Sequence, residues 1–299
     1  MAMHMQGRDS FSAWIMAIRP ATLTAAIIPV VVGTAVAARG GVAHLDAATA
    51  ALIAALLIQI GTNLVNDVDD FERGADSAAR QGPTRVIQAG LLSPEQVRLA
   101  AWMAFGAAAV AGSYLCVVGG WPIMAVGVAA IGSGLAYTGG PWPLGYHGLG
   151  DVFVFIFFGV VAVVGTFYVQ AGCTTSLVVA ASIPVGALAT AILVVNNVRD
   201  FDTDRVAGKH TLAVRFGQGA GRAEFIALVA LAYAVPAALW LVWRSSLWVL
   251  LPWLTLPWAI TLTWRMARCR DGASFNAALR STARLHAAFG VLFAAGLMG

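Results

Sequence analysis

Long apolar runs separated by polar connections dominate the hydrophobic pattern of this chain. Runs of about 17–24 residues are long enough to cross a hydrocarbon core of roughly 30 Å as helices. Lipid offers the backbone no hydrogen-bond partner, so such runs are expected to be helical. We place nine of them, at residues 20–38, 46–66, 95–117, 120–138, 149–170, 175–197, 223–243, 247–265 and 279–298. The pattern predicts an all-α, polytopic membrane protein with about nine transmembrane helices in a single domain over residues 1–299.

The composition favours a membrane protein over a soluble one. Hydrophobic residues make up 60% of the chain and charged residues 11%, whereas soluble domains carry about 25% charged residues. Ahead of the first run, residues 11–19 are expected to form a short interfacial helix that ends at Pro20. The net charge of +4 does not indicate a nucleic-acid partner, which would require a basic patch on a soluble face.

The basic residues predict how the chain is oriented in the membrane. With the N-terminus in the cytoplasm, all of the 18 Lys and Arg residues except Arg39 and Arg244 fall at or just inside the cytoplasmic side. This bias is the one that the positive-inside rule describes. It places two long polar loops, beginning near residues 67 and 198, in the cytoplasm and the C-terminus outside.

Acidic residues gather in two related segments, each directly after an apolar run. Eight of the 14 Asp and Glu residues lie in residues 63–76 and 196–205. Carboxylates held where a membrane helix meets water usually mark a functional site. Residues three and four apart share a helix face, which predicts two polar stripes: Asn63, Asn66, Asp67 and Asp70, and then Asn196, Asp200 and Asp204. The recurrence is a weak internal repeat, which suggests two similar helical halves that meet at a central cavity.

These residue types suggest a magnesium-bound phosphate substrate with an apolar tail. Carboxylate and amide oxygens suit Mg²⁺, which commonly keeps water and substrate phosphates as ligands. Nearby cations are the candidates for holding phosphate oxygens, namely Arg80, Arg85, Arg199, Arg205 and Lys209, with Arg85 and Lys209 the strongest. A lipid diphosphate would place its head at the motifs and its tail between helices. Aromatic rings that would stabilise an allylic cation are sought among Tyr137, Phe153, Phe157, Phe167 and Tyr168.

Several of these motifs resemble a known family. The patterns N-D-x-x-D-x-x-x-G-x-D at residues 66–76 and N-N-x-R-D-x-x-x-D-x-x-x-G-K-x-T-L-A at residues 196–213 are similar to those of the UbiA superfamily of intramembrane aromatic prenyltransferases. Within it, the segments 19–23, 82–87 and 137–151 resemble the 1,4-dihydroxy-2-naphthoate polyprenyltransferases of menaquinone synthesis. The resemblance runs from about residue 12 to 298. Ala21 departs from it, where a basic residue is expected.

The resemblance implies nine helices around a central cavity, capped on the cytoplasmic side of a bacterial inner membrane by the loops 63–94 and 196–222. It also implies transfer of a polyprenyl group from polyprenyl diphosphate to 1,4-dihydroxy-2-naphthoate, with loss of CO₂ and diphosphate and formation of demethylmenaquinone. The residues implied for Mg²⁺ are Asn66, Asp70, Asp76, Asp200 and Asp204. Those implied for catalysis are Asp67, Asp70, Asp200, Asp204 and Tyr137. Those implied for substrate binding are Asn63, Arg85, Asp151, Asn196, Arg205 and Lys209.

Three alternatives remain open from the sequence. Asp151 is a candidate base or orienting group, but a helix N-cap at the same position is an equally good interpretation. If the chain resembles only the superfamily and not the naphthoate group within it, the acceptor would be homogentisate or 4-hydroxybenzoate. An ion-coupled transporter also uses intramembrane carboxylates and repeats, although its site is usually near the bilayer midplane rather than at the helix ends.

Overall fold

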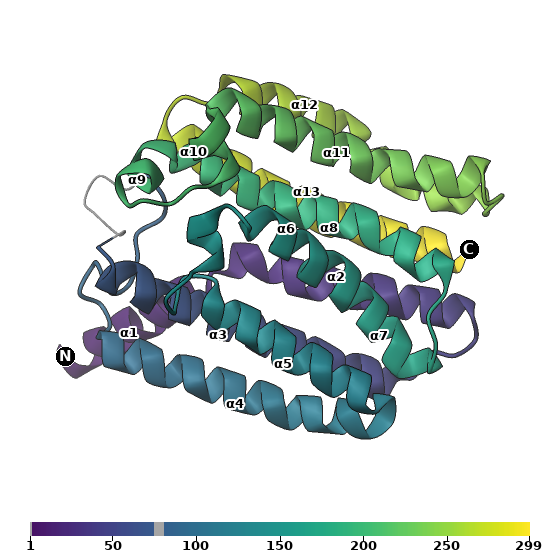
Figure 1. The fold of residues 1–299 in the computed structure, drawn as a ribbon, viewed down its shortest axis with the longest axis horizontal. Helices are drawn as coiled ribbons and strands as arrows, with labels where there is room; N and C mark the ends of the chain where they lie inside the picture. Colours follow the sequence, from purple (N-terminus) through teal and green to yellow (C-terminus); the bar gives the residue numbers. More distant parts are fainter. Residues whose placement is uncertain (1, 75–80) are drawn as a thin grey trace.

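The computed structural model describes residues 2–74 and 81–299, which form a bundle of long helices without strands in these ranges (Figure 1). In chain order the α-helices are α1 (Ala2–Ile18), α2 (Pro20–Arg39), α3 (Leu45–Glu72), α4 (Pro94–Gly119), α5 (Trp121–Ala136), α6 (Gly150–Val154), α7 (Ala162–Ala171), α8 (Ser176–Arg199), α9 (Phe201–Val206), α10 (Leu212–Phe216), α11 (Gln218–Leu241), α12 (Leu256–Arg268) and α13 (Gly272–Met298). A 3₁₀ turn occupies Leu144–His147, a π-helical stretch Phe155–Val161 joins α6 to α7, and a 3₁₀ segment Leu247–Thr255 leads into α12.

The predicted apolar runs all correspond to helices. Among the described residues, eight helical segments are long and apolar enough to cross a membrane, and α5 is a shorter apolar helix of 16 residues. The largest shift in a boundary is at α13, which begins at Gly272 rather than near residue 279. Asp271 caps this helix by accepting a hydrogen bond from the Ser274 amide, and the Ser274 side chain bonds back to the Asp271 amide. This reciprocal capping box starts the helix ahead of its apolar stretch.

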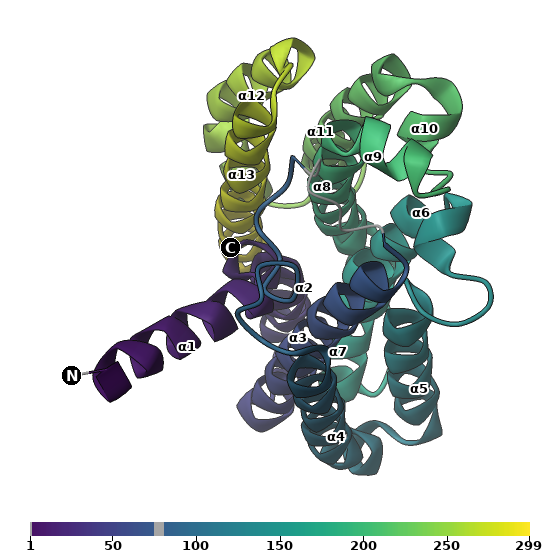
Figure 2. The same cartoon turned by 90° about the vertical axis from the view of Figure 1, so that its left-hand side faces the viewer.

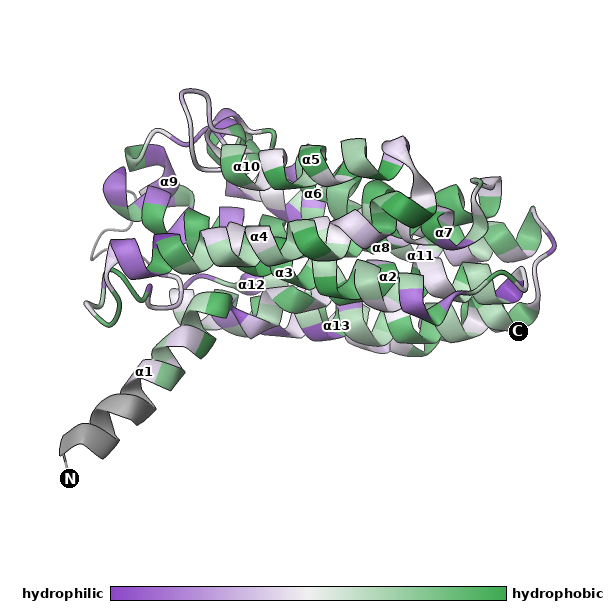
Figure 3. Ribbon diagram, turned by 90° about the horizontal axis from the view of Figure 1, so that it is seen from below, coloured by the Kyte–Doolittle hydropathy of each residue, from purple (hydrophilic) through white to green (hydrophobic). Residues whose placement is uncertain are grey.

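Helix α8 lies at the centre of the bundle. Its apolar side chains Val185, Leu188, Val195 and Val198 are fully buried in the main core cluster. The end-on view shows α8 between α11, α13 and the α6–α7 segment, while α3, α4 and α5 form the other side of the molecule (Figure 2). Hydrophilic residues collect at one end of the bundle, around α9 (Figure 3). The last turns of α3 and α8 therefore deliver both acidic segments to the same end.

Two glycines allow a close approach at the crossing between α8 and the π-helical stretch. A Cβ atom on Gly159 would lie 2.6 Å from the Cα atom of Gly186. A Cβ atom on Gly186 would in turn lie 2.8 Å from the carbonyl oxygen of Phe155. Because backbone atoms occupy both positions, neither side can move aside as a flexible side chain would. The crossing fixes where the α6–α7 segment stands relative to the central helix.

We predict that Gly159→Ala destabilises the folded protein by about 1–3 kcal/mol, the usual cost of adding a methyl group to a tightly packed site. The measurement is the thermal unfolding midpoint of the purified protein in detergent. Gly106→Ala in α4 is the matched control, because a Cβ atom there meets nothing within 4 Å. Equal midpoints for the two variants would contradict the close crossing.

Candidate active site

A charged pocket lies at the polar end of the bundle and adjoins a larger apolar cavity among the helices. The charged pocket has a volume of about 130 Å³ and the apolar cavity one of about 550 Å³. Tyr137, directly after α5, lines both. The polar and charged residues that line the charged pocket are Arg19, Asn66, Asp70, Arg85, Thr138, Tyr146, Asn196, Asn197, Arg199, Asp200, Thr203, Asp204, Lys209 and Thr211.

The first acidic segment is helical, because α3 continues through it to Glu72. Asp67 and Asp70 are both buried at this end of α3. Arg19 and Arg85 both donate to Asp67 Oδ1, and Arg85 Nη2 donates to Asp70 Oδ2 at 3.3 Å. Buried carboxylates require such partners, since an unpaired charge in this position would be strongly destabilising. The α1–α2 junction and the loop after residue 80 are thereby tied to α3.

The second acidic segment is interrupted rather than continuous. Helix α8 ends at Arg199, Asp200 is its C-cap, and the short helix α9 follows. The amide of Asp200 still donates to the Asn196 carbonyl and the amide of Asp204 to the Asp200 carbonyl, at 2.9 and 2.7 Å. All three side chains therefore line the pocket, as their spacing predicts. Arg199 makes a bidentate ion pair with Asp200, at 2.8 and 2.6 Å.

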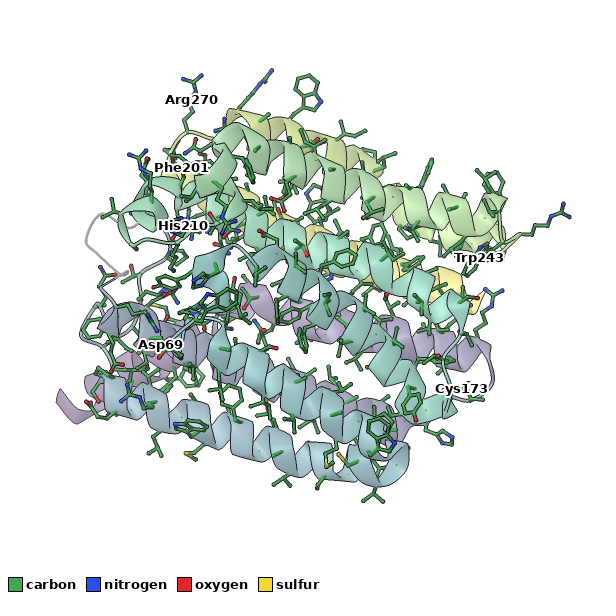
Figure 4. All side chains as sticks on the ribbon, viewed as in Figure 1. Asp69, Cys173, Phe201, His210, Trp243 and Arg270 are labelled. Atoms are coloured by element: carbon green, nitrogen blue, oxygen red, sulfur yellow. The ribbon has the colours of Figure 1, made fainter. Side chains whose placement is uncertain are left out.

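Lys209 connects the two segments. Its Nζ atom donates to Asp70 Oδ1 at 3.1 Å and lies 3.9 Å from Asp204 Oδ1. The two acidic segments therefore share one cation, which means that both reach a common ligand-sized space. In Figure 4, Asp69 on α3 and the labelled Phe201 and His210 of the second segment lie at the same end of the bundle, away from Trp243 and Cys173.

Tyr146, in the loop between α5 and α6, contacts both Asp70 and Lys209. Its hydroxyl donates to Asp70 Oδ1 at 3.3 Å, and its carbonyl accepts from the His210 amide at 2.8 Å. Lys209 Nζ lies 4.9 Å from the centre of its ring and Arg73 Cζ lies 5.4 Å from it, so two cations contact one aromatic ring. Burial and the neighbouring Asp70 carboxylate raise the pKa of the Tyr146 phenol, which therefore stays protonated at physiological pH.

Two glycines make room for Tyr137 at the boundary of the pocket and the cavity. A Cβ atom on Gly150 would lie 2.8 Å from the Tyr137 hydroxyl, and one on Gly145 would lie 3.1 Å from the ring. The Gly145 amide also donates to the Tyr137 carbonyl at 2.9 Å. Larger residues at these two positions would push the ring out of its place. Gly145 and Gly150 are therefore required by the packing of one aromatic side chain.

Several residues proposed from the sequence do not line either space. Asn63 donates instead to the Ile18 carbonyl at 2.9 Å and to Thr22 at 3.1 Å, so it supports the α1–α2 junction. Arg205 is exposed on α9. Asp151 is buried and accepts a hydrogen bond at 3.1 Å from Asn197, which does line the pocket.

The structure places two of the candidate aromatic residues at the apolar cavity and two elsewhere. Phe153 and Phe157 line the apolar cavity and stack with their ring centres 5.9 Å apart. Phe167 is instead buried in the main core, and Tyr168 packs at the outer end of the bundle. Neither of these two lines the cavity. Asp76 and Arg80, also proposed from the sequence, lie outside the described residues.

Sequence reasoning did not single out two residues that the structure places at the site. Arg19 pairs with Asp67 and lines the pocket, and it adopts a left-handed backbone conformation with φ of 56°. Tyr146 contacts Asp70 of the first acidic segment and also Lys209 and His210, which follow the second. Both residues lie in segments that carry the family resemblance, but only their contacts reveal what they do. Four other arginines bond to loops or helix ends and do not line the pocket, namely Arg73, Arg98, Arg215 and Arg222.

The fold and the site define a polytopic helical membrane protein in which oxygen donors and cations meet above an apolar cavity. The chain belongs to the UbiA prenyltransferase family, whose profile matches residues 26–290. It is 36% identical to the 1,4-dihydroxy-2-naphthoate octaprenyltransferase of Mycobacterium tuberculosis, over 91% of this chain and 92% of that protein. It is 33% identical to the enzyme of the same name from Escherichia coli, over 95% and 94%. This membership places the chain among prenyltransferases and not among transporters.

Solved structures share the fold at low sequence identity. An apo UbiA homologue from Aeropyrum pernix K1 superimposes with a TM-score of 0.68 at 15% identity, over 91% of this chain and 96% of that chain. A UbiA homologue from Archaeoglobus fulgidus bound to DMAPP and Mg²⁺ gives a TM-score of 0.62 at 15% identity, over 94% and 98%. These likenesses establish the helical architecture.

We predict that Asp67→Ala lowers the stability of the folded protein by about 3 kcal/mol or more, because it removes a buried carboxylate that accepts from both Arg19 and Arg85. Asp202→Ala is the matched control from the second acidic segment, since Asp202 is exposed. Thermal unfolding midpoints of both variants in detergent provide the measurement. A loss no larger than that of the control would show that the ion pairs do not hold this end of the bundle together.

Proposed function

We propose that this protein transfers a polyprenyl group from polyprenyl diphosphate to 1,4-dihydroxy-2-naphthoate, releasing CO₂ and diphosphate and forming demethylmenaquinol, the reduced form of demethylmenaquinone. The observation that carries the proposal is the junction at Tyr137 between a charged pocket and an apolar cavity, because the donor joins a charged head to a long apolar tail. The names of the bacterial relatives support the naphthoate acceptor. We place the protein in a bacterial cytoplasmic membrane, with the charged end facing the cytoplasm as the basic residues predict.

The residues of the pocket fit a Mg²⁺ ion that is shared with the donor. No group of three His, Cys, Asp or Glu side chains within the described part of the chain is arranged to hold a metal alone. Carboxylate and amide oxygens nevertheless face the pocket from both acidic segments, and Mg²⁺ usually completes its shell with water and substrate phosphate. The residues that would hold the ion are Asn66, Asp70, Asn196, Asp200 and Asp204. Asp76 remains a further candidate outside the described residues. When bound, the ion would neutralise charge that develops on the leaving diphosphate.

Arg85 and Lys209 are the residues we assign to the diphosphate oxygens. Both line the pocket and each pairs with Asp70. Lys209 also lies against Tyr146, which limits the directions in which its ammonium group can point. Arg19, just before α2, and Arg199, at the end of α8, line the same pocket and add positive charge to it. Donors fixed in this way stabilise a leaving group without having to rearrange during the reaction.

The reaction exchanges two bonds at the junction of the pocket and the cavity. The bond between prenyl C1 and the diphosphate oxygen breaks, and its electron pair leaves with diphosphate. The naphthoate ring carbon that bears the carboxylate then bonds to prenyl C1. The bond from that carbon to the carboxylate breaks, its electron pair restores the aromatic ring, and CO₂ departs. We assign the Tyr137 ring to the developing allylic cation, since aromatic faces attract positive charge.

Asp151 acts indirectly in this proposal. It fixes the Asn197 side-chain amide by accepting its hydrogen bond, and Asn197 faces the pocket. The amide then presents its carbonyl oxygen in a defined direction, which suits the orientation of a hydroxyl group of the acceptor. Asn63 and Arg205 are assigned no substrate contact in this proposal, because neither side chain lines the pocket.

We predict that Asp70→Asn and Asp204→Asn each lower kcat by at least about a hundredfold, the scale observed when one fixed electrostatic contact of an active site is removed. Asp202→Asn, two positions from Asp204 but exposed, should keep activity near that of the unaltered protein. Initial rates with increasing Mg²⁺ give the measurement, and EDTA should abolish turnover until Mg²⁺ is restored. Near-normal rates for both pocket variants at saturating Mg²⁺ would overturn the assignment.

The acceptor is tested separately. We expect mass spectrometry of products from purified protein, Mg²⁺ and a polyprenyl diphosphate to detect prenylated, decarboxylated product with 1,4-dihydroxy-2-naphthoate. Homogentisate and 4-hydroxybenzoate serve as competing acceptors in the same reaction. Product from either of these but not from the naphthoate would replace the proposed acceptor while leaving the prenyltransferase chemistry intact.

A further inference from the structure

The apolar cavity extends from Tyr137 toward the opposite end of the bundle. Its walls come from α2, α3, α4, α5 and the α6–α7 segment. At the far end, Ala54, Leu115, Ile123 and Val169 line it and pack together as a separate buried cluster. These side chains come from four different helices, α3, α4, α5 and α7, which pack together at the outer end of the cavity.

Three glycines line the outer half of this cavity, one each from α4, α5 and α7. At Gly112, Gly127 and Gly165, a Cβ atom would meet nothing within 4 Å. Gly127 precedes Tyr137 by ten residues, which corresponds to about 15 Å along a helix axis. The cavity wall thus lacks a side chain at three positions in this outer half. Any larger residue at these positions would occupy space that the backbone leaves open.

We propose that Gly112, Gly127 and Gly165 determine how long a prenyl tail the protein accepts. The occupant of this part of the cavity is the distal portion of the tail whose diphosphate lies in the charged pocket, because the two spaces meet at Tyr137. The inference rests on the proposed function and adds to it the selection of the donor. Short tails end before the three glycines, whereas long tails pass them.

The surroundings of these glycines support a role in selection over one in helix packing. Gly33 and Gly61 are required by packing, since a Cβ atom there would lie 2.5 Å from the Val163 carbonyl oxygen and 2.8 Å from the Phe105 ring. The three cavity glycines meet no such neighbour. Glycine lowers helix stability by roughly 1 kcal/mol relative to alanine, and at these positions no close contact in the bundle offsets that cost. Gly106 and Gly132 also meet no neighbour, but only Gly112, Gly127 and Gly165 line the space that we assign to the tail.

The test uses phenylalanine substitutions in matched pairs on the same helices. Gly112→Phe and Gly127→Phe fill the cavity from α4 and α5. Gly106→Phe and Gly132→Phe are their controls, because these glycines are exposed, meet nothing within 4 Å and do not line the cavity. Full-length protein in detergent is supplied with Mg²⁺, 1,4-dihydroxy-2-naphthoate and either geranyl or octaprenyl diphosphate. The quantity compared is the ratio of kcat/KM for octaprenyl diphosphate to that for geranyl diphosphate.

We expect this ratio to fall at least about tenfold in the two cavity variants, because several apolar groups of the long tail lose their burial. It should stay unchanged in the two controls. An unchanged ratio in Gly127→Phe and Gly112→Phe, or an equal loss for both donors in correctly folded variants, would overturn the inference. An equal fall in the control variants would overturn it as well.

A binding measurement separates this inference from the proposed function. The Kd of each donor, obtained from thermal shifts with Mg²⁺ and no acceptor, should show the same change in ratio. If the donor binds but the naphthoate is not prenylated, the proposed acceptor is wrong. The ratio of the Kd values for the two donors then tests on its own whether the glycines select the tail length. Absence of binding by either prenyl diphosphate to the unaltered protein would overturn both.

Discussion

The structure depends on pairing carboxylates that lie at helix C-termini. The backbone dipoles already give the end of a helix partial negative charge, and α3 carries Asp67 and Asp70 in its last turns while α8 ends at Asp200. Acidic residues there are unfavourable unless cations compensate them. The cations come from separate parts of the chain, with Arg19 before α2, Arg85 in the loop before α4 and Lys209 after α9. These ion pairs thus bring together segments that are distant in the sequence, and the charged pocket forms where the segments meet.

The rest of the bundle holds the charged pocket in a fixed position next to the apolar cavity. Helix α8 is buried along most of its length and carries the second acidic segment at its end. The contact between Gly159 and Gly186 fixes the α6–α7 segment against it, and Phe157 in the same π-helical stretch faces the cavity. Departures from regular α-helix of this kind are frequent at functional sites. A rigid scaffold of this type keeps the reacting centre at Tyr137 in a constant position.

Hydrophobic run length was sufficient to predict the spans, because lipid leaves the backbone few alternatives. The spacing of Asp70, Asp200 and Asp204 likewise predicted residues that line the pocket. Asn63 lies on the same stripe but faces the α1–α2 junction, and sequence spacing alone does not tell which part of a stripe meets a neighbouring helix. Phe167 was misplaced for a related reason, since a span that is apolar on all sides carries no pattern that marks its cavity face. Arg19 was missed because its role depends on a partner 48 positions away.

The pairing within the charged pocket also bears on which solutes compete for it. Arg19, Arg85, Arg199 and Lys209 face three pocket carboxylates, and Asp67 lies behind the first two cations. Positive and negative side chains are therefore nearly equal in number. A solitary anion such as inorganic phosphate would engage the cations but leave the aspartates without partners, whereas a metal-loaded anion satisfies both sets. A ligand that binds this pocket well must therefore carry both positive and negative charge. The pocket discriminates in this way against the abundant simple phosphates of a cell, without a steric barrier at its mouth.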